Sequence, residues 1–65
     1  MIELQKFDTK NTATIDRLIC TKKQAIETAI RRSMQYVKVI LRIGKKWNEY
    51  EKGEKTAWSY PDGIE

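Results

Sequence analysis

The feature that most constrains this chain is a change of hydrophobic period near its middle. From Thr21 onward, apolar residues recur at the spacing of one helical face, and Thr21 with Gln24 three residues later forms a capping-box pattern. In residues 37–43, VKVILRI, every second side chain from Val37 to Ile43 is apolar, whereas Lys38 and Arg42 fall on the other face, which is the period of a half-buried strand. The sequence therefore predicts a capped helix that leads directly into a strand. The predicted buried stripe of the helix is Ala25, Ile26, Ala29, Ile30, Ser33, Met34 and Val37.

The segments on either side of this unit predict further strands. Residues 2–7, IELQKF, alternate in the same way and precede the turn-forming residues 8–11. Residues 12–20 favour a second strand because of their β-branched residues, although the spacing of Ile15, Leu18 and Ile19 also fits a helix. Lys52-Gly53 separates two short aromatic runs and predicts a hairpin. We therefore expect an α+β fold, one helix on an antiparallel sheet, in the order strand–strand–helix–three-strand meander.

The register of the predicted hairpin decides which aromatic side chains share a face. A loop of two or four residues places Trp47 opposite Trp58, with Tyr60 on the same face. A loop of three residues instead places Tyr50 diagonal to Trp58, again with Tyr60, and turns Trp47 to the other side. Such a face either stacks nucleic-acid bases or packs beneath the helix, and the sequence leaves both uses open.

Composition narrows the class of protein. With 65 residues we expect one compact domain over 1–60 and a short C-terminal tail over 61–65. The chain has a single cysteine, Cys20, and no histidine, so it lacks the usual metal ligands and the commonest general base. No apolar run is long enough to cross a bilayer, and the N-terminal residues do not have the pattern of a secretory signal. We expect a non-enzymatic, cytoplasmic protein with no cofactor, metal site, membrane contact or small-molecule substrate.

The charge and the aromatic residues indicate a binding function. The net charge of +4 and pI near 9.4 favour a polyanionic partner. We expect nucleic acid, or a nucleic-acid-binding complex, to be contacted by a basic helix face and an aromatic hairpin. The alternative is an inhibitor or adaptor that blocks the nucleic-acid channel of a host protein or nucleoprotein complex, since the chain is similar in size and layout to many small phage and mobile-element proteins. A homodimer that covers a strand edge is a third possibility. The candidate contact residues are Lys23, Arg31, Arg32, Lys45, Lys46, Tyr50, Trp58 and Tyr60.

Overall fold

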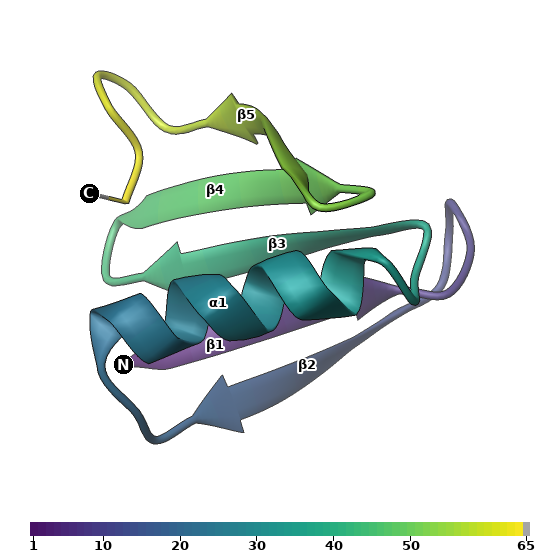
Figure 1. The fold of residues 1–65 in the computed structure, drawn as a ribbon, viewed down its shortest axis with the longest axis horizontal. Coiled ribbons are helices and arrows are strands. Elements are labelled where there is room, and N and C mark those ends of the chain that lie inside the picture. Colours follow the sequence, from purple (N-terminus) through teal and green to yellow (C-terminus); the bar gives the residue numbers. More distant parts are fainter. Residues whose placement is uncertain (65) are drawn as a thin grey trace.

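The computed structural model describes residues 1–64 and shows one helix packed on a five-stranded antiparallel sheet (Figure 1). The elements are β1 (Ile2–Phe7), β2 (Ala13–Leu18), α1 (Lys22–Ser33), β3 (Lys38–Ile43), β4 (Lys46–Glu51) and β5 (Glu54–Trp58). This order confirms the predicted α+β class and the strand–strand–helix–three-strand arrangement. Residues 12–20, which the sequence left open, contain the strand β2.

The strands lie in the order β2-β1-β3-β4-β5, and every neighbouring pair is antiparallel. The chain leaves β2 at one edge, crosses one face of the sheet as α1, and returns as β3 beside β1 (Figure 1). Leu4 of β1 stands opposite Leu41 of β3, and both are fully buried beneath α1. The other face of the sheet carries no helix, and we call it the open face.

The helix begins as the sequence predicts. Thr21 Oγ1 accepts a hydrogen bond from the Gln24 amide (3.2 Å), and Gln24 Oε1 accepts one from the Thr21 amide (3.1 Å), which completes the capping box. The side chains that face the sheet are small: Ala25, Ala29 and Ser33 are buried. These residues allow α1 to lie close to β3, β4 and β1.

The buried stripe of the helix is narrower than predicted. Ile30 is 37% exposed, Met34 67% and Val37 51%. The sheet covers only the side chains of α1 that point directly at it, because no second helix of residues 1–64 packs against the flanks of α1. Ile30 and Met34 therefore lie on an exposed flank of α1, and Val37 precedes β3 at the surface.

The end of the described chain belongs to the core, although the sequence predicted a tail after residue 60. Ile64 is 2% exposed, and its amide donates to Asn48 Oδ1 (2.9 Å). Asn48 Nδ2 in turn donates to the Ile64 carbonyl (3.4 Å) and to the Tyr50 hydroxyl (3.0 Å). The buried side-chain amide of Asn48 thus holds Ile64 against the helix side of β4.

Candidate nucleic-acid interface

The β4–β5 hairpin determines where the aromatic side chains point. Lys52 and Gly53 both have positive φ (51° and 85°) and form a two-residue loop, one of the loop lengths that the sequence left open for the predicted hairpin. The register then shifts: Tyr50 pairs with Lys55, but Glu49 pairs with Ala57. Thr56 is therefore the extra residue of a β-bulge.

The bulge separates the two tryptophans. Trp58 stands opposite Asn48 on the helix side of the sheet, whereas Trp47 stands opposite Arg42 on the open face. A two-residue loop without the bulge would have placed Trp47 opposite Trp58, so that predicted pairing is wrong. The grouping of Tyr50 with Trp58 on one face, which the sequence linked to a three-residue loop, is the one observed.

Tyr50 is not available to a partner. It is 3% exposed, and its hydroxyl accepts the hydrogen bond from Asn48 Nδ2 within the core. The prediction that Tyr50 stacks or wedges at a surface is therefore corrected: it is a structural residue of β4. The sequence carries no clear signal for this burial, because Tyr50 shares its face of the strand with the polar Asn48 two residues earlier.

Trp58 and Tyr60 remain exposed, at 47% and 95%. The Lys55 ammonium lies 4.8 Å from the centre of the Trp58 ring, a cation–π arrangement. The residue between Trp58 and Tyr60, Ser59, is hydrogen-bonded to β4. Ser59 and Trp47 exchange two hydrogen bonds, Ser59 N–H to the Trp47 carbonyl (3.0 Å) and Trp47 N–H to Ser59 Oγ (3.1 Å). Tyr60 is thus displayed on a short anchored segment.

Lysines gather at the same end of the molecule. The start of α1, the turn between β3 and β4, and the segment after β5 lie on the left in Figure 1. These three segments, with the strand residues that adjoin them, carry exposed basic and aromatic side chains. We call this region the lysine–aromatic end, and its residues are Lys22, Lys23, Lys45, Lys46, Trp58 and Tyr60. Lys22, which was not among the predicted contacts, joins this group because it opens the first turn of the helix.

Two of these lysines occupy a position that does not favour the helix. The first turn of α1 contains Lys22 and Lys23 and no acidic residue. A cation near a helix N-terminus opposes the macrodipole, and each such charge costs the helix about 0.3–1 kcal/mol.

Arg31 and Arg32 lie at the opposite end of the helix. The last turn of α1 contacts the β4–β5 loop, since the Gly53 amide donates to Ser33 Oγ (2.8 Å). The positive charge of Arg32 acts on Lys6 of β1, where it opposes the rise in the pKa of that lysine. The structure therefore divides the predicted basic residues into two groups, separated by the length of a helix of about 18 Å.

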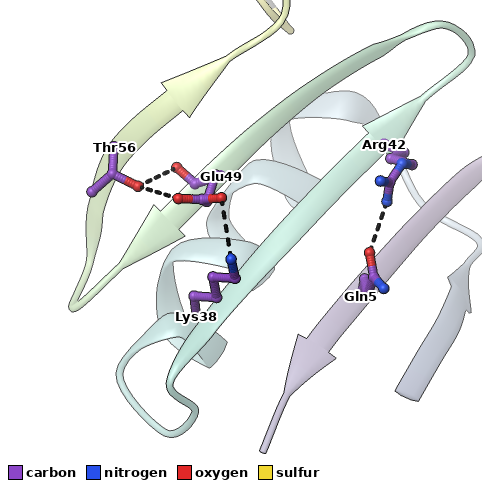
Figure 2. A network of polar contacts seen from close by, with 5 residues as sticks. All are labelled: Gln5, Lys38, Arg42, Glu49 and Thr56. Atoms are coloured by element: carbon purple, nitrogen blue, oxygen red, sulfur yellow. Dashed lines mark hydrogen bonds and ion pairs between the residues drawn. The ribbon is translucent and has the colours of Figure 1, made fainter. Parts of the chain in front are cut away.

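The open face carries charges that compensate one another, as Figure 2 shows. Lys38 pairs with Glu49 (3.7 Å), whose carboxylate also accepts from Thr56 Oγ1 (3.1 Å). Arg42 donates to Gln5 Oε1 (2.9 Å). Glu3 stands between Arg17 and Arg42 in the sheet register.

Charge compensation continues at the β1–β2 side of the sheet. Lys6 and Asp16 form an ion pair (2.6 Å), and the hydrogen bond that the Lys6 ammonium donates to this carboxylate raises the pKa of Lys6 above its usual value. Lys6 and Lys38 thus each have an acidic partner within the sheet.

Within residues 1–64 the surface has no enclosed pocket and no group of acidic, cysteine or histidine side chains arranged to hold a metal ion. No helix in this part of the chain has both the length and the apolar character needed to cross a bilayer. Comparison of the chain with protein-family models, with curated proteins and with solved structures gave no match.

Proposed function

We propose that this protein is a small, non-enzymatic nucleic-acid-binding protein of the cytoplasm, and that its lysine–aromatic end makes the contact. The supporting observation is that exposed Lys45, Lys46, Lys22 and Lys23 lie at the same end of the molecule as exposed Trp58 and Tyr60. Phosphates would meet the lysines, and bases would stack on the rings. Stacking of a base on an aromatic side chain contributes about 1–3 kcal/mol and tolerates any sequence.

The two ends of α1 provide a matched test. Lys45→Gln combined with Lys46→Gln removes charge beside the aromatic residues, whereas Arg31→Gln combined with Arg32→Gln removes the same charge from the other end. Affinity for short DNA and RNA strands should fall with the lysine variant and change much less with the arginine variant. The plot of log affinity against log salt should lose about 0.7 in slope for each lost contact to a single strand.

Tryptophan fluorescence reports the contact directly. The chain has two tryptophans, so Trp47→Phe leaves Trp58 as the sole tryptophan signal. Titration with oligonucleotide should quench this signal at low salt, and the quenching should weaken steeply as salt rises. Absence of quenching at low salt, or an equal loss of affinity from both charge variants, would reject the lysine–aromatic end as the binding surface.

A second function is favoured by the exposed apolar flank of α1. Met34 lies over the β4–β5 loop, because a Cβ on Gly53 would be 3.2 Å from its sulfur, and Ile30 is one helical turn away on the same flank. Apolar side chains of this kind suit a protein partner, as expected of an inhibitor that binds a nucleic-acid-binding complex. Binding to such a partner should depend weakly on salt and be lost with Met34→Glu, while oligonucleotide binding is retained.

A further inference from the structure

The edge strand β2 has free backbone groups in a defined pattern. The Asp8 amide donates to the Thr12 carbonyl (2.9 Å) at the β1–β2 turn, so the backbone carbonyl of Thr12 points toward the β1 side of the strand. Backbone groups alternate in direction along an antiparallel strand. The N–H and C=O groups of Ala13, Ile15 and Arg17 therefore point away from the sheet, toward solvent.

The two edges of the sheet differ in how they are protected. At β5, the bulge at Thr56 interrupts the ladder, and the chain folds back after Trp58 to bury Ile64. Bulges and returning segments are common means of blocking strand addition. β2, in contrast, pairs with β1 over six consecutive residues without a register shift, and Ile15 at its centre is 57% exposed.

We propose that β2 pairs with β2 of a second copy, antiparallel, about a two-fold axis at Ile15. In this alignment Ile15 lies opposite its symmetry mate, and Ala13 lies opposite Arg17 of the other copy. All the outward N–H and C=O groups of the strand find partners, and no like charges stand opposite each other. On the helix side of the sheet, Thr14 lies opposite Asp16 and can donate its hydroxyl to that carboxylate.

The neighbouring alignments are less favourable. A two-fold axis at Asp16 places two carboxylates directly opposite each other, which destabilises a strand pair. An axis at Thr14 shortens the overlap of the outward-facing residues, because Arg17 then extends past Ala13 of the other copy. The sequence of β2 thus selects the alignment at Ile15 by charge and by the number of hydrogen bonds.

The proposed dimer does not depend on nucleic-acid binding. Its two-fold axis is perpendicular to the sheet, so both helices lie on the same side of one continuous sheet. The two lysine–aromatic ends then lie at opposite ends of the sheet along the strand direction. The contact buries little apolar surface besides Ile15. Contacts below about 1,200 Å² are usually weak, and we expect dissociation in the range of roughly 10–500 µM.

Sedimentation equilibrium across this concentration range, without nucleic acid, tests the proposal. Ile15→Pro removes the N–H groups exchanged at the axis and should weaken the dimer about tenfold to a hundredfold. The monomer should keep its fold, because a proline is accepted on an edge strand where the N–H faces solvent. Ile15→Lys, which places like charges at the axis without altering the backbone, provides a second disruption.

Register-specific cross-linking separates this dimer from any other. In a Cys20→Ser background, Ile15→Cys places two thiols on residues with Cα atoms about 5.5 Å apart, within disulfide range. Thr14→Cys is the matched control, since its symmetry mates are offset by two residues and lie about 8 Å apart. We expect a cross-linked dimer from Ile15→Cys only. A monomer at every concentration, a dimer insensitive to both Ile15 variants, or equal cross-linking at the two positions would overturn the proposal.

Discussion

Replacement of Gly63 by alanine should destabilise the fold far more than the same change at Gly44. The two glycines have nearly the same backbone conformation, with φ of +66° and +63°. They differ in their surroundings. A Cβ on Gly63 would clash with Asn48 Oδ1 and lie 2.7 Å from the Trp58 Cβ, whereas a Cβ on Gly44 would meet nothing within 4 Å.

The expected magnitudes follow from these contacts. Alanine in the left-handed region costs about 1–2 kcal/mol, and Gly44→Ala should show this cost alone. Gly63→Ala must also displace Asn48 from Ile64. This displacement weakens two hydrogen bonds of about 0.5–1.5 kcal/mol each and exposes part of a buried isoleucine, whose full burial contributes about 1.5–3 kcal/mol. We expect about 3–6 kcal/mol in total for Gly63→Ala.

Denaturant unfolding followed by tryptophan fluorescence measures both variants. A domain of 65 residues has a free energy of unfolding of about 3–10 kcal/mol, so Gly63→Ala is best measured with a stabilising osmolyte present at equal concentration in all samples. The informative quantity is the difference between the two variants, about 2–4 kcal/mol. Equal destabilisation by Gly44→Ala and Gly63→Ala would show that Asn48 and Ile64 do not anchor the chain end.

Three further changes test other contacts. Ser33→Ala leaves the Gly53 amide without its acceptor, and denaturant unfolding should show a loss of about 1–3 kcal/mol, with Thr28→Ala on the same helix as the control. Thr21→Ala removes the helix cap and should cost about 0.5–2 kcal/mol in the same assay. Asp16→Asn removes the partner that raises the pKa of Lys6, so the stabilisation by this pair is present below the unfolded pKa near 10.5 and is lost as pH rises through the higher folded value. The stability difference between wild type and Asp16→Asn should therefore shrink above about pH 10.5 in pH-dependent unfolding, and a difference that persists there would contradict this explanation.

The elements of the fold could be predicted from local patterns, because each one depends on residues close in sequence. The capping residues Thr21 and Gln24 fix the helix start, and the alternation through Val39 and Leu41 fixes a strand and its buried face. Lys52-Gly53 marks the hairpin loop. These signals are sufficient to place one helix on a sheet.

The candidate site could be predicted only in part, because it depends on contacts between distant residues. The bulge at Thr56 places Trp58 and Trp47 on opposite faces of the sheet. The alternation of apolar and polar residues in so short a strand does not reveal a register shift of one residue. The burial of Ile64 depends on Asn48, sixteen residues earlier in the chain. The separation of Arg31 from the lysines follows from the length of α1, which places its two ends on opposite sides of the molecule.

The position of β1 inside the sheet has a consequence for the order of folding. β1 pairs with β2 through a short turn, but its other partner is β3, and the Gln5–Arg42 contact joins residues 37 positions apart. Closing a loop of this length is entropically costly before the core forms, whereas β3, β4 and β5 connect through tight turns. The three-strand meander with α1 should therefore assemble early. Docking of β1 and β2 as a hairpin would complete the sheet, so hydrogen exchange should protect β3 and β4 before β1 during refolding.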